Sequence, residues 1–371
     1  MKIKALKTKV ATLLKFGITG VVLSLLAAHQ TLPVEAYYSN GQPASGVVGQ
    51  TDKDGVGIYS SATVNNPTNV GMNGVAGVSL DTTRHLAYIA DTNNSRVMVY
   101  NLEVDNSFSD YKADYVIGQS DFSNTRQNRG AGSLANNSLS MPTRVVVEQS
   151  TGNVYVADTG NNRVLIFATV ITNDPDALRV IGAANFTSSN SSGTVSQGTM
   201  LSPVGIAIYG SGSSTKVYIA DRDFNRVMVF GQITSDGQNA QYVIGQSDFI
   251  SSTSGLSQTA LAGPHDVDVD SSGKIFVTDT GNNRIMVWNS AISGNGQSAN
   301  VVLGQTWFYS NSEGVSATAL NKPRGVSVDG GGRLLVSDSG NNRVLIWTSV
   351  TTSAQAANNV VGQSNFTSNS S

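Results

Sequence analysis

The chain contains no cysteine. Disulfide bonds, thiol catalysis and attachment of a lipid through cysteine are therefore excluded, and stability must come from a packed core. Histidine is almost as rare, with three among 371 residues. Charged residues make up only 13% of the chain, and the formal net charge is −2. This composition does not favour a metal centre rich in histidine or a strongly basic face.

Long apolar runs are also missing, except for one near the N-terminus. The stretch FGITGVVLSLLAA (16–28) follows five lysines and is shorter than the roughly 20 residues that span a bilayer. A basic leader with a short apolar core is typical of a secretory signal, and Val34 and Ala36 are small residues suited to cleavage. We therefore predict a signal peptide at residues 1–36 and a secreted or extracytoplasmic protein, in the periplasm or at the cell surface. An uncleaved N-terminal anchor is the alternative.

Removal of residues 1–36 takes five lysines and Glu35 from the 23 basic and 25 acidic residues, which leaves 18 and 24. The remaining chain then carries a net charge of −6. Such a chain is not expected to bind nucleic acid, because phosphate binding needs a basic patch. No second apolar run of spanning length occurs, so we expect no membrane contact after cleavage.

Helical periodicity is absent after the signal, and a repeat takes its place. Five times a strand-like run ends in Asp, passes through a polar Gly/Asn turn, and restarts at Arg. The copies are ADTNNSRVMVY (from Ala90), ADTGNNRVLIF (Ala157), ADRDFNRVMVF (Ala220), TDTGNNRIMVW (Thr278) and SDSGNNRVLIW (Ser337). Repetition at a nearly constant period indicates one supersecondary unit stacked on copies of itself.

Each copy contains four strand-like pieces. In the second copy they are TRVVVEQ, NVYVAD, RVLIF and LRVIGAANF, starting at residues 143, 153, 163 and 178. Short runs rich in Val, Ile, Tyr and Phe, separated by Gly and Asn turns, are typical of an antiparallel meander. The fourth piece ends in a recurring Phe, which we expect to pack between adjacent sheets. These phenylalanines are Phe122, Phe186, Phe249, Phe308 and Phe366.

Four strands per unit and several units in a row predict an all-β fold, a β-propeller of four-stranded antiparallel blades. The aspartates of the turns are 67, 63, 58 and 59 residues apart. A solenoid is less suitable, because solenoid periods are usually shorter. We place the propeller at residues 37–371, with repeats at about 72–122, 139–186, 200–249, 261–308 and 320–366.

The pattern Pro-x-Gly-Val, a Gly turn, then Val-Tyr-Val-Ala-Asp-Thr-Gly-Asn-Asn-Arg-Val resembles the NHL repeat. The resemblance implies a propeller, typically with six blades. It does not imply one activity, because such domains include partner-binding modules, sensor domains of membrane kinases, RNA-binding modules and a peptidyl amidoglycolate lyase. The lyases hold zinc with several histidines. Only His85 and His265 remain here after signal removal, so that activity is not expected.

The number of blades is open on the sequence. Five full copies are present, but VVGQTDK (47–53) resembles a sixth fourth strand that precedes the first copy. We predict six blades, with residues 47–50 as the outer strand of a blade whose other strands would follow Ser371 in a longer chain. A complete ring of five blades is the alternative.

Two groups of polar residues are candidates for function. The first is the Asp–Arg pair of each turn, for which we predict a structural role and, as the alternative, a repeated binding surface. The pairs are Asp91 with Arg96, Asp158 with Arg163, Asp221 with Arg226, Asp279 with Arg284, and Asp338 with Arg343.

The second group consists of departures from the repeat. Arg144 and Asp266 replace the Gly of the first strand, which is Gly77, Gly205 and Gly325 in the other copies. Each begins an inner strand, so we expect Arg144, His265, Asp266 and Arg324 to meet at one rim of the axial channel. They are joined by Asp268, which alternates with Asp266 on one strand face. Together these five residues are our candidate site for a cation or a small polar ligand. The alternative is that Asp266 and Asp268 form salt bridges across blades and that Asp270 is an ordinary turn residue, like Asp81 and Asp329.

No cofactor is predicted. The run from Asp266 to Gly273 is similar to a calcium loop, and a calcium ion in the channel is one option, but the bidentate Glu of such loops is missing. We predict a monomeric binding scaffold for a protein or glycan partner. The alternative is a propeller hydrolase or lyase with a metal at the channel rim, using Asp266, Asp268 and His265.

Overall fold

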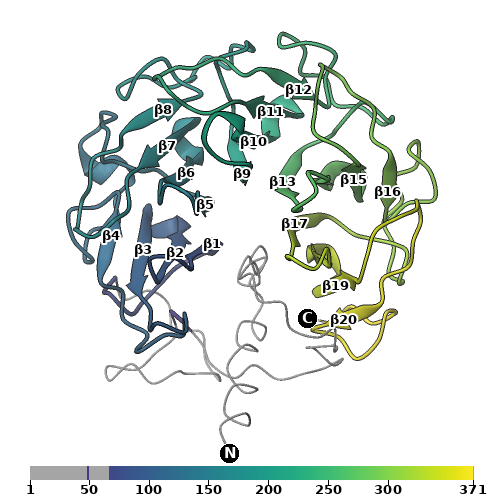
Figure 1. The fold of residues 1–371 in the computed structure, drawn as a ribbon, viewed down its shortest axis with the longest axis horizontal. Coiled ribbons are helices and arrows are strands. Elements are labelled where there is room, and N and C mark those ends of the chain that lie inside the picture. Colours follow the sequence, from purple (N-terminus) through teal and green to yellow (C-terminus); the bar gives the residue numbers. More distant parts are fainter. Residues whose placement is uncertain (1–47, 50–66, 371) are drawn as a thin grey trace, which may run out of the picture.

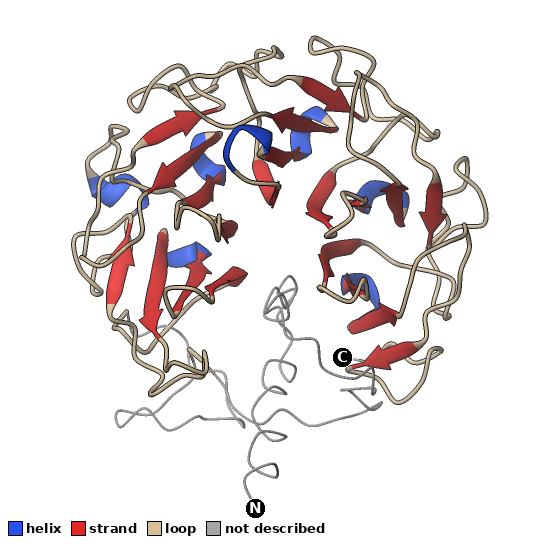
Figure 2. Ribbon diagram, viewed as in Figure 1, coloured by secondary structure: helices blue, strands red, loops and turns tan. Residues whose placement is uncertain are grey.

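The computed structural model describes residues 48–49 and 67–370, which form five four-stranded antiparallel sheets. The predicted signal peptide lies outside the described residues. Short runs of β-branched and aromatic residues form the strands, and glycine and asparagine turns separate them (Figures 1 and 2). In the described part, helix is limited to short 3-10 turns, and no segment there is both helical and apolar over a length that could cross a membrane.

The strands follow one another in each blade from the axis outward. Blade 1 consists of β1 (Val75–Asp81), β2 (Leu86–Asp91), β3 (Arg96–Asn101) and β4 (Tyr115–Ile117). Blade 2 consists of β5 (Arg144–Val147), β6 (Val154–Asp158), β7 (Arg163–Phe167) and β8 (Arg179–Ile181). Blade 3 consists of β9 (Pro203–Tyr209), β10 (Lys216–Asp221), β11 (Arg226–Phe230) and β12 (Tyr242–Ile244). Blade 4 consists of β13 (Pro264–Val269), β14 (Ile275–Asp279), β15 (Arg284–Trp288) and β16 (Val301–Leu303). Blade 5 consists of β17 (Pro323–Val328), β18 (Leu334–Asp338), β19 (Arg343–Trp347) and β20 (Asn359–Val361).

The blades lie around a common axis, with β1, β5, β9, β13 and β17 nearest to it (Figure 1). Each of the first four inner strands contacts the inner strand of the next blade along the chain. The all-β propeller is therefore confirmed. The prediction of six blades is not met by the described residues, which form five. It assumed that an isolated fourth-strand motif must belong to a full sheet.

Val48 and Gly49 explain why that motif was misleading. They form a bend and not a strand, yet Gly49 has φ +82°, close to the values of Gly118, Gly182, Gly245 and Gly304 at the ends of the fourth strands. Each of those glycines lies against a Leu or Met in the loop that leads into the next blade, and Gly49 lies against Met72 in the same way. The motif thus keeps its contact with blade 1. Residues 50–53 of the motif lie outside the described part.

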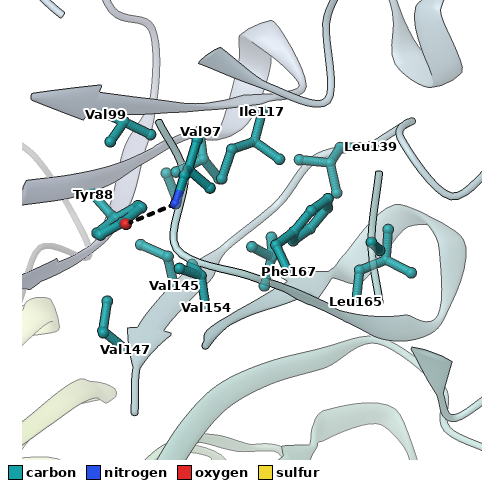
Figure 3. Packing of buried hydrophobic residues seen from close by; sticks show 14 of the residues in the cluster. Tyr88, Val97, Val99, Ile117, Leu139, Val145, Val147, Val154, Leu165 and Phe167 are labelled. Atoms are coloured by element: carbon teal, nitrogen blue, oxygen red, sulfur yellow. Dashed lines mark hydrogen bonds between the residues drawn. The ribbon is translucent and has the colours of Figure 1, made fainter. Parts of the chain in front are cut away.

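The core consists of apolar clusters between consecutive blades. The cluster between blades 1 and 2 combines Tyr88, Val97 and Ile117 with Val154 and Phe167 (Figure 3). Similar clusters join blades 2 and 3, 3 and 4, and 4 and 5. The recurring phenylalanines are partly buried and pack against apolar clusters, Phe122 against the cluster of blade 1.

Candidate functional site

Every blade has the same buried ion pair where its second and third strands meet. The Asp ends β2, β6, β10, β14 or β18, and a short 3-10 turn leads to the Arg that begins the next strand. The pairs join one carboxylate oxygen to Arg Nε at 2.7–2.8 Å, and both side chains of the pair in blade 2, Asp158 and Arg163, have no exposed surface. We call the end of the propeller that carries these turns the turn face.

Each carboxylate also fixes the loop that precedes its own blade. Asp158 Oδ1 accepts a hydrogen bond from the backbone N–H of Ser140 (2.7 Å), and its Oδ2 accepts one from Asn161 Nδ2 (2.7 Å). The guanidinium of Arg163 donates to the carbonyls of Ala135, Ser138 and Phe186. The pair therefore connects the incoming loop, the turn and the outgoing loop of one blade. Because these side chains are buried, they are not available to a partner.

Blade 3 departs from this arrangement. Phe224 replaces the Asn of the turn, so Asp221 lacks one donor, and the guanidinium of Arg226 lies 5.0 Å from the centre of the Phe224 ring. Burial raises the pKa of Asp221 to about 6, against the opposing effect of Arg226. The first residue of the same turn is Arg222, where blades 1, 2 and 4 have a Thr whose hydroxyl donates to a Pro carbonyl of the next blade.

The innermost strands bring Arg144 and Asp266 together. Arg144 Nη1 lies 3.3 Å from Asp266 Oδ2, and both side chains are buried. The pair reaches from blade 2 to blade 4, past Gly205 of blade 3. A Cβ on Gly205 would lie 2.5 Å from the Cα of Asp266 and 2.7 Å from its Oδ1. Glycine is therefore needed in blade 3, because a side chain there would collide with Asp266.

The aspartates of β13 bind blade 5 through backbone donors. Asp266 Oδ2 accepts from Val326 N (3.1 Å), and Asp268 Oδ2 accepts from Val328 N (2.8 Å). Burial raises the pKa of both carboxyls, to about 6 for Asp268. Asp270 is not part of this contact, because it accepts hydrogen bonds from its own turn, from Ser272 N and Lys274 N.

His265 and Arg324 lie beside this pair at the axial rim, by which we mean the first residues of the inner strands on the turn face. The backbone of Arg324 forms a hydrogen bond with the His265 ring. Burial lowers the pKa of His265 to about 4, and the positive charges of Arg324, Arg222 and Arg144 act in the same direction. The structure therefore brings Arg144, His265, Asp266 and Arg324 together, as the sequence led us to expect. Asp268 lies two residues after Asp266 on β13.

These residues do not fit a calcium or zinc site. Within residues 48–49 and 67–370, no three His, Asp or Glu side chains are grouped so that they could hold a metal ion. Each oxygen of Asp266 and Asp268 already accepts a hydrogen bond from a backbone N–H group, and a cation would compete with those donors.

One exposed feature was missed by the sequence reasoning. Trp307 and Tyr309 flank the recurring Phe308 in the loop after β16, and they are 70% and 71% exposed. At the place of Trp307 the other four blades have an Asp or Asn whose side chain accepts backbone N–H bonds of the loop, such as Asp121 with Ser123 N (2.8 Å). The available signal was this departure from the repeat.

The loop that carries both aromatic residues lies on the turn face. The carbonyl of Phe308 accepts a hydrogen bond from Arg284, the first residue of β15 after the turn. Trp288 and Trp347, the other two tryptophans, are fully buried, and their indole N–H groups donate to Gln297 O and Gln355 O. Trp307 is thus the one exposed tryptophan of the three.

Comparison with known proteins supports the repeat identified above. Residues 139–167, 261–288 and 320–347 match the NHL repeat, and these segments are the first three strands of blades 2, 4 and 5 together with the residues that lead into them. No curated protein matches the chain.

Several solved structures match parts of the chain. A streptogramin B lyase structure matches with 10% identity over 76% of this chain and 67% of that chain, with a TM-score of 0.43. Selenomethionine-substituted virginiamycin B lyase from Staphylococcus aureus matches with 10% identity over 74% and 66%, with a TM-score of 0.39. A chain of a nidogen/laminin complex matches with 13% identity over 80% and 88%, with a TM-score of 0.46. The arrangement of the blades and the three matched segments identify the chain as a β-propeller that contains NHL repeats.

Proposed function

We propose that this chain is a secreted binding scaffold that holds a protein or glycan partner on its turn face. The observation that carries the proposal is the exposed pair Trp307 and Tyr309. Large aromatic side chains contribute much of the free energy of binding at interfaces, because they bury a large area with few rotatable bonds.

The loop position of the pair separates blade 4 from the other blades. In blades 1, 2 and 3 the place of Trp307 is held by Asp121, Asn185 and Asp248, and each of these side chains accepts a backbone hydrogen bond of its loop. Trp307 cannot accept such a bond through its side chain. Blade 4 therefore lacks a stabilising contact and has two exposed rings instead, which suits a contact surface better than a structural role.

The test is a blade-4 loop variant, Trp307→Asp with Tyr309→Ser, which introduces the residue types of blade 1 at these places. If the partner is a glycan, the wild-type protein should bind to an oligosaccharide array. If the partner is a protein, p-benzoylphenylalanine introduced at position 309 should form a crosslink to a protein of the extracellular medium. The loop variant should lose array binding. Acrylamide quenching of Trp307 fluorescence should weaken when the bound oligosaccharide is added.

Ile171 provides the matched control. It is 67% exposed, but it lies in the loop between β7 and β8, which is at the opposite end of the blade from the turn face. Ile171→Ser should keep array binding, and a crosslinker at position 171 should remain unreacted. Array binding identifies a glycan partner, and a crosslink from position 309 but not from position 171 identifies a protein partner. Absence of both, or equal crosslinking from positions 171 and 309, would contradict the proposal.

A further inference from the structure

Arg144 and Arg324 stand on inner strands that both contact Asp266, Arg144 through its side chain and the strand of Arg324 through Val326 N, and Arg222 lies in the turn after β10. Arg144 belongs to blade 2, Arg222 to blade 3 and Arg324 to blade 5, and all three act electrostatically on His265 of blade 4. Each stands at a place where other copies of the repeat have an uncharged residue, such as Gly77 for Arg144 and Thr280 for Arg222. The positive charge is therefore a local departure from the repeat and not a property of every blade.

The guanidinium of Arg144 has unused hydrogen-bonding capacity. Its side chain is only 7% exposed, and its one ionic contact is the 3.3 Å approach of Nη1 to Asp266. Among the residues that the structure describes, the buried Nε–H has no acceptor. By contrast, Arg163 donates four hydrogen bonds, including one of 2.8 Å to Asp158. An additional acceptor at Arg144 would therefore be stabilising, because a buried donor without an acceptor is unfavourable.

The other two arginines differ in how far their charge is balanced. Arg222 pairs with Asp223, at 2.8 Å between Nε and Oδ1. Arg324 is exposed and has no carboxylate partner in the part of the chain that the structure describes. Asp266 is already bound by Arg144 and by two backbone N–H groups, so it does not balance Arg324.

We propose that the axial rim binds an oxyanion, a carboxylate or a phosphate group, through the guanidinium groups of Arg144 and Arg324. Planar guanidinium groups match the oxygens of both anions, and a donor that is already partly desolvated gives a stronger contact than an exposed one. Arg222 adds positive potential at His265, which is neutral at pH 7. This anion site is independent of the partner proposed for Trp307 and Tyr309.

The experiment follows the imidazole resonances of the full chain by NMR at pH 7 and constant ionic strength. Inorganic phosphate is titrated in one series and citrate in another. His265 should shift along a saturable curve, whereas His85 should not move, since its ring contacts Asn106 in the loops at the other end of blade 1. A response to phosphate alone assigns a phosphate group, and a response to citrate alone assigns a carboxylate. Responses to both support the shared chemistry.

Two variants test whether Arg324 contributes to the anion site. Arg324→Gln removes an exposed side chain without an ion-pair partner in the described part of the chain, so it should fold normally and bind the responding anion at least about tenfold more weakly. Arg179→Gln changes another exposed arginine, on β8, and should leave the dissociation constant unchanged. Shifts that are linear, that are equal for His85 and His265, or that Arg324→Gln does not weaken would indicate an adventitious ion only and would overturn the proposal. So would the absence of any His265 shift.

Discussion

The buried Asp and Arg side chains of the turns have nearly all of their donors and acceptors engaged in hydrogen bonds. Asp158 and Arg163 illustrate this, because the carboxylate accepts from three donors and the guanidinium meets three carbonyls besides the carboxylate. Such a buried ion pair adds little to the free energy of unfolding when it is compared with a well-packed apolar pair. Removing one partner is costly, because the other charge stays buried and unpaired.

Arg163→Gln should therefore lower the free energy of unfolding by about 3–5 kcal/mol. The measurement is urea unfolding followed by circular dichroism. Arg179→Gln is the control, and it should change the free energy by less than about 0.5 kcal/mol, because Arg179 is exposed. Equal, small losses in both variants would show that the ion pairs do not support the blades.

Because His265 is buried, we expect the free energy of unfolding to depend on pH. Its pKa is about 4 in the folded protein and about 6.5 in the unfolded chain, so the unfolded chain binds more protons between these values. The free energy of unfolding should fall as the pH is lowered from 6.5 to 4. Asp268, with a folded pKa of about 6, acts in the opposite direction between pH 6 and 4.

Comparison with His265→Gln isolates the histidine, because Asp268 is present in both proteins. The variant should lose about 1–2 kcal/mol less than the wild type between pH 7 and pH 4.5. Urea unfolding at the two pH values measures this. Identical losses would mean that His265 is not held neutral in the folded protein.

Among strands and loops, the turns contain a further recurring element. The last turn residue is Asn162, Asn225, Asn283 or Asn342 in four blades, with φ between +52° and +56°. Asn283 shows its use: Nδ2 donates to Asn311 O, and Oδ1 accepts from Lys322 N in the loop that leads into blade 5. Asparagine tolerates this backbone conformation and at the same time joins two blades.

Two substitutions separate these roles. Asn283→Gly should cost about 1–2 kcal/mol, because it removes two hydrogen bonds but keeps a residue suited to positive φ. Asn283→Ala should cost about 1 kcal/mol more, because it adds backbone strain. Thermal or urea unfolding of both variants provides the comparison. Equal losses would contradict the backbone part of the explanation.

Most strands could be predicted from the sequence. RVLIF coincides with β7 (Arg163–Phe167), and NVYVAD differs from β6 (Val154–Asp158) by one residue. Alternating β-branched residues between glycine turns specify such strands locally. By contrast, LRVIGAANF contains only the three-residue β8, since the following Gly182 has φ +83° and ends the pairing.

The contacts between distant residues could be predicted only in part. The meeting of Arg144, His265 and Arg324 followed from their shared place in the repeat. The Arg144–Asp266 pair was not specified, because it depends on the missing side chain of Gly205 in the blade between them. A structural role was predicted for the turn aspartates, but their distant partners were not, since Asp158 binds the N–H of Ser140, 18 residues earlier. Local sequence does not contain that information.

At the scale of the whole propeller, a metal ion at the axial rim would distinguish a metal-dependent enzyme from a binding scaffold. Asp266 and Asp268 use their oxygens to bind blade 5. We therefore expect the melting temperature to be unchanged by EDTA and by added calcium or zinc. A rise with calcium or zinc that Asp266→Asn abolishes would support the metal-dependent enzyme instead. Differential scanning fluorimetry is sufficient for this comparison.

In the whole molecule, the repeated residues stabilise the fold, and the exposed departures from the repeat, Trp307, Tyr309 and Arg324, are assigned to binding. The most direct test of this division is the free energy of unfolding of the blade-4 loop variant, Trp307→Asp with Tyr309→Ser. If the aromatic pair is present for a partner, the variant should be at least as stable as the wild type. It should be about 0.5–1.5 kcal/mol more stable if the introduced carboxylate accepts the loop hydrogen bonds that Asp121 accepts in blade 1. A loss of more than about 2 kcal/mol would show that the two aromatic residues are structural, and it would contradict this division of roles.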